Sequence, residues 1–402
     1  MFLNKDFIEV IYEAAHIQRW NDHIRPQEGF TELDKQAHKM MILYVLAKFE
    51  EEDHDAKLNW QVLIEGGIFE FLQRIILTDI KPPIFHELMA SHGKELNEWV
   101  YGELKRKIPS FDQAMIDKMK NYFDNDEYKK EKKLLRAAHY LATEWEFRIV
   151  YHMNQGIYGI EKIKTDIANE IEEHYNLAGV QKIALNGKTR QFIDLVGKLR
   201  FQKRWAKSPR VPETSVMGHE LVVGIMGYFC ALKKDACPKR AINAFLTGLF
   251  HDLPEVLTRD IISPIKRSIE GLDSLIKEIE IRQINEKILP LLPATWHKEL
   301  VYFTENEFCD KVEVNGKIVY CSPEDIDSKY NENKFNAVDG SMLKACDNLA
   351  AYVEAWLSIM HGITSISLKS GKEGIFNMYK GKSVAGINFG EIYESFENDD
   401  KF

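Results

Sequence analysis

The chain has 402 residues, of which 45% are hydrophobic and 29% charged, and its formal net charge is −9. This composition is ordinary for a globular protein and provides enough apolar material for two cores. The negative charge argues against a general nucleic-acid binder held by phosphate contacts.

Cysteine usage and hydropathy give an expected location. The five cysteines are odd in number and form no CxxC pair, which favours free thiols in a reducing cytoplasm. The longest strongly apolar run, residues 221–232, is too short to span a bilayer. The N-terminus carries acidic residues where a signal peptide would have an apolar core. We therefore expect a cytoplasmic protein without a membrane or nucleic-acid partner.

The second half of the chain repeats the first, weakly but at a consistent spacing. His38 recurs as His219, an offset of 219 − 38 = 181 residues. A run of identities at one offset seldom arises by chance, so we interpret the chain as a tandem duplication with a boundary between about 160 and 190. Seven further residues recur at this offset: Gly67, Phe69, Leu72, Asp79, Ile80, Pro83 and Ile84, which correspond to Gly248, Phe250, Leu253, Asp260, Ile261, Pro264 and Ile265.

The offset then grows, which indicates an insertion in the second copy. Residues 135–146 parallel residues 343–354 at an offset of 208, so the insertion is 208 − 181 = 27 residues. Residues 311–320 alternate apolar and polar side chains around Asn315-Gly316, which predicts a β-hairpin. Elsewhere helical periodicity dominates; examples are residues 37–49, 215–232, 240–251 and 341–360. We expect an all-α protein with two helical domains, residues 1–165 and 186–402, and one small hairpin in the second.

Residues 248–266 place several ionisable groups amid apolar ones. They include His251, Asp252, Glu255, Asp260 and Lys266. Charged groups are costly to bury unless something compensates them, and a divalent cation does so. The His251-Asp252 doublet follows an apolar helical segment, so it is not expected on a solvated face. Lys266 could add positive potential for a phosphate, but a solvated lysine fits equally well.

Two distant residues could complete a metal site. His219 and Asp347 both lie on apolar helical faces. The plain alternatives are a core histidine with one hydrogen bond and a buried salt bridge. Together with His251 and Asp252 they supply two imidazoles and two carboxylates. That mixture suits Mn²⁺, Co²⁺, Ni²⁺, Zn²⁺ or Fe²⁺ better than Ca²⁺ or Mg²⁺.

The order H, then HD, then D, with HDLPEVLTRDIISPIK at the doublet, resembles the HD-domain metal-dependent phosphohydrolase superfamily. Within it, the chain is most similar to the bacterial 5'-deoxynucleotidase group. That group carries an Arg-Trp pair fifteen residues before its first metal histidine, and Arg204-Trp205 precede His219 at this spacing. The resemblance covers roughly residues 190–360. It implies that both halves are HD-type bundles and that one divalent metal is held by His219, His251, Asp252 and Asp347.

The resemblance also implies roles for the neighbouring residues. Glu255 becomes a catalytic residue, and Asp260 contacts substrate near the leaving oxygen. Arg204 grips the phosphate, and Trp205 orients the substrate. Each has a simpler alternative: an exposed helix carboxylate, a turn or capping aspartate, a surface cation and a core indole. The ion would polarise a phosphoryl oxygen and lower the pKa of a water molecule.

The first copy departs from the superfamily pattern. The doublet position reads Glu70-Phe71, the last aspartate reads His139, and of the four ligands only His38 remains. We therefore predict that residues 1–165 keep the bundle but have no metal site. Arg19-Trp20 remain, so a phosphate-binding role and a purely structural role both stay open for this half.

The function implied by the resemblance is a metal-dependent phosphohydrolase that removes the 5'-phosphate of a (deoxy)nucleoside monophosphate. One alternative is hydrolysis of a cyclic nucleotide, a dNTP or a guanosine alarmone on the same site. Another is a nucleotide sensor without turnover. The expected partner is a small phosphate ester, and a homodimer or an internal pseudo-dimer would fit a duplicated chain.

Overall fold

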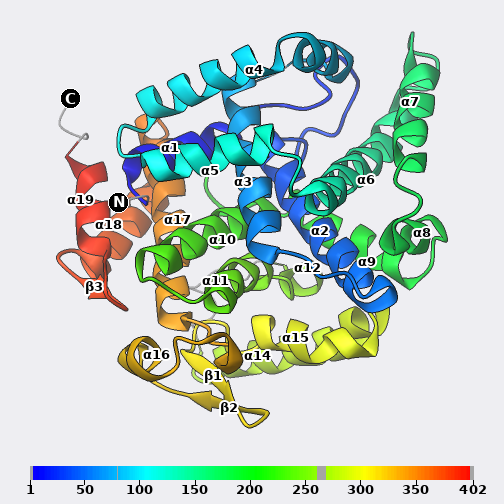
Figure 1. Ribbon diagram of the computed structural model, residues 1–402. Coiled ribbons are helices and arrows are strands. Elements are labelled where there is room, and N and C mark those ends of the chain that lie inside the picture. Colours follow the sequence, from blue (N-terminus) through cyan, green and yellow to red (C-terminus); the bar gives the residue numbers. More distant parts are fainter. Residues whose placement is uncertain (1–2, 79, 260–268, 399–402) are drawn as a thin grey trace. The chain divides into compact units, whose positions relative to one another are not determined.

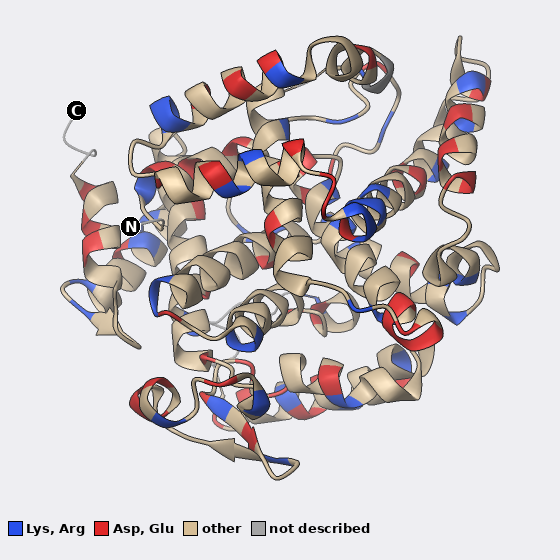
Figure 2. Ribbon diagram, viewed as in Figure 1, with Lys and Arg blue, Asp and Glu red and all other residues tan. Residues whose placement is uncertain are grey.

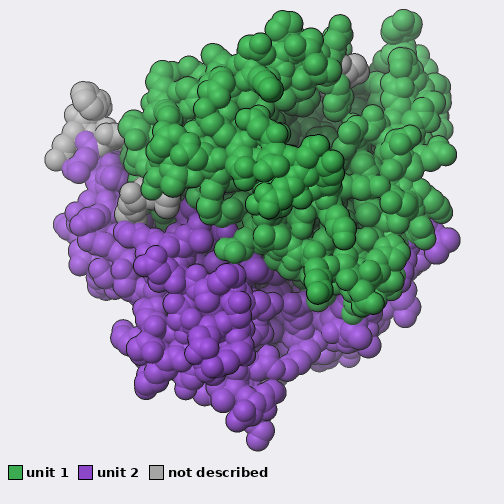
Figure 3. Space-filling view, in the orientation of Figure 1, with its two compact units in different colours: residues 1–181 green, residues 182–402 purple. Residues whose placement is uncertain are grey.

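The computed structural model describes residues 3–78, 80–259 and 269–398. The chain divides into two compact units, unit 1 (residues 1–181) and unit 2 (residues 182–402), coloured separately in Figure 3. Helices dominate both units (Figure 1), and the strands found in the described residues form only two small hairpins. The predicted all-α class with a small hairpin is confirmed. The predicted domain assignments and the duplication stay predictions.

Unit 1 is built around a pair of long packed helices. α2 begins after Thr31, whose side chain caps the helix by accepting from the backbone N–H of Asp34, and it packs along α6. α2 is buried around nearly its whole circumference, including Lys35 and Lys39. The elements are α1 (Lys5–Glu13), α2 (Glu32–His54), α3 (Trp60–Leu77), α4 (Pro82–Lys107), α5 (Gln113–Asp124), α6 (Lys129–Met153), α7 (Ile160–Glu172) and α8 (Ala178–Ala184), which ends beyond the division.

Unit 2 contains the predicted helices of the second half. Residues 215–232, 240–251 and 341–360 correspond to α10, α11 and α17, and residues 37–49 of the first half lie within α2. The elements are α9 (Lys188–Gly197), η1 (Lys198–Phe201), α10 (Val216–Lys233), α11 (Pro238–Phe250), α12 (Glu255–Thr258), α14 (Leu272–Gln283), η2 (Ile284–Ile288), η3 (Leu289–Leu291), α15 (Ala294–Thr304), β1 (Lys311–Val314), β2 (Lys317–Tyr320), α16 (Pro323–Lys329), η4 (Asn333–Phe335), α17 (Gly340–Met360), α18 (Ile366–Tyr379), β3 (Ser383–Val384), β4 (Ile387–Asn388) and α19 (Phe389–Glu397).

Helices α10, α11 and α17 form the core of unit 2, and two of their contacts depend on glycine. A Cβ on Gly248 of α11 would lie 2.6 Å from the Cα of Gly224 on α10. A Cβ on Gly227 would lie 2.6 Å from the Leu343 side chain on α17. The helix backbones therefore approach more closely than larger side chains would allow. This packing brings together residues that are more than a hundred positions apart in the sequence.

Among the described residues, one helix, Val216–Lys233, is long and apolar enough to cross a membrane. Figure 2 shows few charged residues along it, as its sequence requires. However, 89% of this helix is buried inside the protein, and a core helix passes the same test of length and composition. The finding is therefore weak support for a membrane span.

The predicted hairpin is present at the expected turn. β1 pairs antiparallel with β2, with Lys311 opposite Tyr320 and Val314 opposite Lys317. Asn315 and Gly316 both have positive φ, 50° and 74°, as a two-residue hairpin loop requires. The second hairpin, β3–β4, was not predicted. Its strands have two residues each, too few for an alternating pattern to be read. The five cysteines are free.

Candidate metal centre and phosphate site

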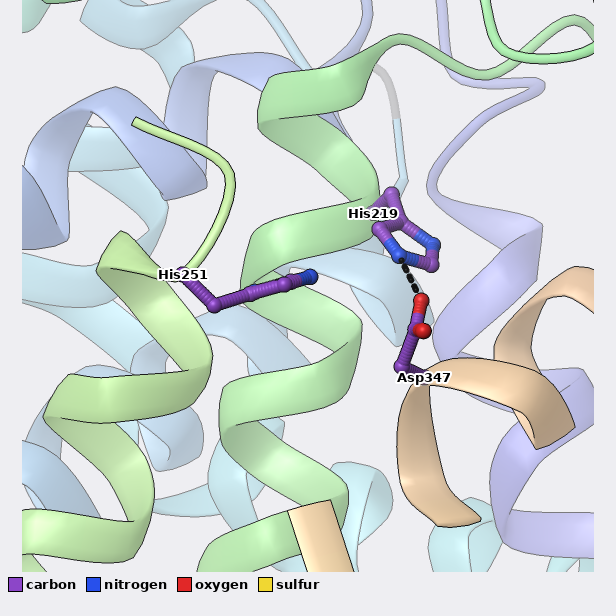
Figure 4. Close-up of side chains that lie close together, drawn as sticks. All are labelled: His219, His251 and Asp347. Atoms are coloured by element: carbon purple, nitrogen blue, oxygen red, sulfur yellow. Dashed lines mark hydrogen bonds and ion pairs between the residues drawn. The ribbon is translucent and has the colours of Figure 1, made fainter. Parts of the chain in front are cut away.

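Three of the four predicted metal ligands lie together in unit 2 (Figure 4). His219 comes from the first turns of α10, His251 from the residue after α11, and Asp347 from the first half of α17. One ligand atom of each lies within 4.8 Å of the others. His219 Nε2 is 2.9 Å from Asp347 Oδ1, and the two imidazole centroids are 5.6 Å apart. This is the convergence that the sequence pattern required.

The backbone orients the ring of His251 for ligation. Its Nδ1 lies 2.8 Å from the carbonyl oxygen of Gly248, so Nδ1 donates to that oxygen and Nε2 is the ring nitrogen that faces Asp252. A histidine ligand whose second nitrogen is held by a carbonyl is typical of metal sites. Only 4% of His251 is exposed, so the ring is buried.

Asp252, the fourth predicted ligand, lies beside this trio rather than within it. Its Oδ2 is 3.3 Å from His251 Nε2 and 3.8 Å from an Nη atom of Arg204. Burial raises the pKa of the Asp252 carboxyl, but His251 and Arg204 outweigh burial and hold that pKa below its ordinary value. Asp252 is thus a carboxylate that links the candidate metal ligands to the predicted phosphate-binding arginine.

Asp347 is also held in the charged form. Burial alone would raise its pKa, but Lys344, His219 and His251 lower it well below the ordinary value. Lys344 Nζ lies 2.7 Å from Asp347 Oδ2, and burial of the ammonium is outweighed by Asp347, which raises the pKa of Lys344. Sequence reasoning did not assign Lys344. The sequence feature that could have identified it is a lysine three residues before a buried aspartate on the same helix.

Glu354, two turns along α17 from Asp347, connects the two parts of the site. Its carboxylate accepts from Trp205 Nε1 at 3.1 Å and from Thr214 Oγ1 at 2.8 Å. It also lies 3.6 Å from His219 Nδ1 and 3.8 Å from Arg204 Nε. One buried carboxylate therefore holds both a predicted ligand and the predicted substrate-binding pair.

The electrostatics of Glu354 match this position. Burial raises its pKa, but Arg210, 3.4 Å away, together with His219 and Arg204, lowers the pKa to about 2. Sequence reasoning gave Glu354 no role and did not single out Arg210. The sequence feature that could have identified Glu354 is a glutamate on an otherwise apolar helix.

The loop that carries Arg204 and Trp205 lines an open pocket of about 240 Å³. Trp205 has a positive φ of 56°, a conformation that costs an aromatic residue energy and is found at functional sites. A Cβ on Gly371 of α18 would lie 2.5 Å from the indole, so a glycine is needed there. The pocket is lined by four cations and one acid among nine residues: Lys203, Arg204, Trp205, Ala206, Lys207, Ser208, Pro209, Arg210 and Glu213.

The remaining predicted residues have different outcomes. Glu255 begins α12 and is 6% exposed, and its backbone N–H donates to the carbonyl of Asp252 at 2.9 Å. The alternative of an exposed helix carboxylate is therefore wrong. Glu220, which was not predicted, is fully buried, and burial, then Asp252 and Glu255, raise its pKa well above the ordinary value. Asp260 and Lys266 lie outside the described residues.

The residues present fit a divalent cation. The trio offers two imidazole nitrogens and a carboxylate oxygen, the donor types that bind transition metals. His251 is already oriented through its second nitrogen. A further carboxylate, that of Asp252, lies next to the trio. The convergence of buried donors is the structural reason to expect an ion here.

The class of this region follows from comparison with known families. Residues 196–375 match the HD domain family. HD domains bind divalent metal, and the segment contains all four predicted ligands together with Arg204 and Glu255. The resemblance inferred from the sequence is thus confirmed for residues 196–375, which are similar to the HD domain.

Curated relatives refine the likeness. The chain is 26% identical over 126 residues to a 5'-deoxynucleotidase of Photobacterium profundum, covering 30% of this chain and 63% of that protein. It is 23% identical over 178 residues to a 5'-deoxynucleotidase of Pasteurella multocida, covering 44% and 77%. It is 29% identical over 106 residues to a 5'-deoxynucleotidase of Photorhabdus temperata, covering 26% and 53%. The chain thus spans 53% to 77% of the length of these relatives, and the likeness supports the HD phosphohydrolase type of hydrolase.

Proposed function

We propose that this protein is a metal-dependent phosphohydrolase that releases the 5'-phosphate of a nucleoside monophosphate, with a deoxynucleotide as the preferred substrate. The observation that carries the proposal is the convergence of His219, His251 and Asp347 within 4.8 Å. Arg204, which lines the cationic pocket, lies 3.8 Å from the neighbouring Asp252. The names of the curated relatives support the choice of substrate.

The proposed cofactor is a single divalent transition metal held by His219, His251, Asp347 and Asp252. When bound, the ion supplies Lewis-acid chemistry, because it withdraws charge from a phosphoryl oxygen and makes water more acidic. Manganese, cobalt, nickel, zinc and iron all suit the donor set.

The chain's own residues provide binding and orientation. Arg204, 3.8 Å from Asp252, can donate a forked pair of hydrogen bonds to phosphate oxygens beside the ligands. Trp205, fixed by Glu354, gives the substrate a rigid apolar wall in the pocket. Glu255 follows the ligand doublet on a buried turn and is proposed to move the proton to or from water.

Elemental analysis combined with a substrate panel tests the proposal. The panel contains nucleoside mono-, di-, tri- and cyclic phosphates, each in ribo and deoxy form. We expect one tightly bound divalent ion per chain and release of inorganic phosphate from monophosphates. His251→Ala and Asp252→Ala should lose both the metal and the release. His361→Ala, an exposed histidine just after α17, is the matched control and should keep both.

The panel also separates the alternatives. Preference for a triphosphate, a cyclic nucleotide or an alarmone would replace the substrate but keep the site. Binding of nucleotide and metal without turnover would make the protein a sensor. Undiminished turnover in His251→Ala or Asp252→Ala would overturn the proposed site. The cytoplasmic location, and the choice between a homodimer and an internal pseudo-dimer, stay predictions.

A further inference from the structure

Unit 1 contains a second cluster of buried ionisable side chains, which we call the unit 1 cluster. Its members come from the segment before α2 and from α2, α3 and α6. Lys35 and Lys39 are both 0% exposed. The cluster consists of the cations Arg19, Lys35, Lys39 and Arg74, the carboxylates Glu32, Glu70 and Glu146, and the imidazole of His139.

Two lysines contact the residues that stand at metal-ligand positions of the predicted repeat. His139 corresponds to Asp347 (139 + 208), and Lys35 Nζ lies 2.5 Å from its Nδ1. Glu70 corresponds to His251 (70 + 181), and Lys39 forms an ion pair with it. The ammonium groups are bonded to these residues directly, so this part of unit 1 supplies positive charge from side chains rather than from a metal.

The predicted phosphate-binding pair of unit 2, Arg204-Trp205, has a counterpart in unit 1. Arg19 Nε donates to Glu146 at 2.7 Å, and Trp20 Nε1 donates to the same carboxylate at 2.9 Å. In unit 2, Trp205 donates to Glu354 in the same way. Trp20 also has a positive φ of 59°, against 56° for Trp205. The Arg-Trp-Glu arrangement is present in both units, although the predicted ligand set is not.

The charges of the unit 1 cluster balance only when Lys35 is neutral. Burial and then the surrounding cations, Lys35 first, lower the pKa of His139 well below its ordinary value, so this imidazole is neutral. Four cations and three carboxylates leave a net charge of 4 − 3 = +1 when every lysine is protonated. Burial lowers the pKa of Lys35 well below its ordinary value, and Glu32 and Glu146 compensate only in part. Buried positive charge without a full counter-charge is costly.

The cluster reaches the protein surface on one side. The side chain of Arg19 is 13% exposed, that of Arg74 20% and that of Glu70 29%. Arg74 Nε lies 3.7 Å from Glu32, and one of its Nη atoms donates to the carbonyl of Ile80. A guanidinium has five N–H donors, so both arginines keep donors for a ligand. Both arginine side chains are therefore partly accessible from solvent.

We propose that unit 1 binds a phosphate monoester through Arg19, Arg74 and Lys35 without a metal and without hydrolysing it. The dianion supplies a counter-charge for protonated Lys35 and accepts charge-assisted hydrogen bonds from the two guanidinium groups. Phe71 stands where unit 2 has Asp252, so a carboxylate needed for the metal is replaced by an apolar ring. The phosphate held in unit 1 is a ligand and not a substrate.

Calorimetric titration of the full-length, chelator-treated protein with inorganic phosphate tests this proposal. Arg204→Met serves as the background, because it removes the phosphate-binding arginine of unit 2. We expect this variant to bind one phosphate per chain. Adding Arg74→Met or Lys35→Met should weaken that binding about tenfold or more, since each removes a charged donor. Lys57→Met, at an exposed position of unit 1, is the matched control and should leave the affinity unchanged.

Circular dichroism and metal-dependent turnover of the single variants show whether they fold. Lys35→Met keeps the length of the side chain but leaves the partners of a buried cation behind, which can cost about 3–5 kcal/mol; Arg74→Met, at a partly exposed position, is therefore the second variant. An Arg204→Met protein that binds no phosphate would overturn the proposal. So would phosphate binding with the same affinity in the Arg74→Met and Lys35→Met variants. The titration uses neither metal nor turnover, so its failure is distinguishable from failure of the proposed hydrolase activity.

Discussion

Replacing Glu354 with glutamine isolates the charge that holds the two parts of the unit 2 site together. The side chain keeps its size and one acceptor oxygen, so it can still accept from Trp205 Nε1. Thr214 donates to the other carboxylate oxygen, so its hydroxyl must turn and accept from the new NH2 group. The negative charge beside Arg210 and Arg204 is lost. The substitution therefore removes electrostatic stabilisation without creating a cavity.

The magnitude follows from the pKa of this carboxyl. Burial raises it, but Arg210, His219 and Arg204 bring it from 4.5 to about 2, which corresponds to roughly 3 kcal/mol of stability at neutral pH. Because the folded-state pKa is lower than the unfolded one, this stability is present above about pH 4.5. It is lost as the pH falls towards 2. Glu354→Gln should therefore lower the free energy of unfolding at pH 7 and flatten its decline below pH 5.

Urea unfolding of the metal-free protein between pH 3 and pH 7 measures this effect. Glu332→Gln is the matched control, because Glu332 pairs with Lys334 at the surface of the same unit, where both side chains are more than 60% exposed. An exposed pair contributes under about 1 kcal/mol. We also expect Glu354→Gln to raise the KM for a phosphate ester about tenfold, as Arg204 loses its anchor. If both variants behave alike at every pH, the reasoning about Glu354 is refuted.

Three further predictions concern packing, the hairpin turn and the metal. Gly248→Ala places a Cβ 2.6 Å from Gly224 Cα and should lower the free energy of unfolding by about 1–3 kcal/mol, seen as a lower melting temperature. The control Gly374→Ala, whose Cβ has nothing within 4 Å, should be neutral or stabilising. Equal melting temperatures would contradict the close-packing argument. Gly316→Val forces a β-branched residue to a φ of 74° and should cost about 1–2 kcal/mol while leaving phosphate release intact. Removing the metal with a chelator should lower the free energy of unfolding by about 3 kcal/mol if the ion is present at a hundredfold its Kd. The chelator should not change the stability of His251→Ala. An equal loss of stability in that variant would place the metal elsewhere.

Much of the fold was readable from local patterns. Helical periodicity predicted α10, α11 and α17 because each buries an apolar stripe that repeats every three or four residues. Asn315-Gly316 predicted the β1–β2 turn because few dipeptides adopt two successive positive φ angles. The hairpin β3–β4 was missed, since strands of two residues carry no period. The HD doublet and its spacing from Arg204-Trp205 were enough to indicate the chemistry of the HD domain.

The sequence by itself determined which residue types are available: two histidines and two aspartates on otherwise apolar segments, with a basic and aromatic pair ahead of them. Only the tertiary structure decided how they meet. It placed His219, His251 and Asp347 within 4.8 Å, set Asp252 beside them, and made Glu354 the common partner of His219, Arg204 and Trp205. The physical reason is that periodicity reports which face of a helix is buried, whereas the neighbour of that face depends on contacts between distant segments. Lys35 and Lys39 show the same limit, because nothing local in α2 indicates that two of its lysines are buried against His139 and Glu70.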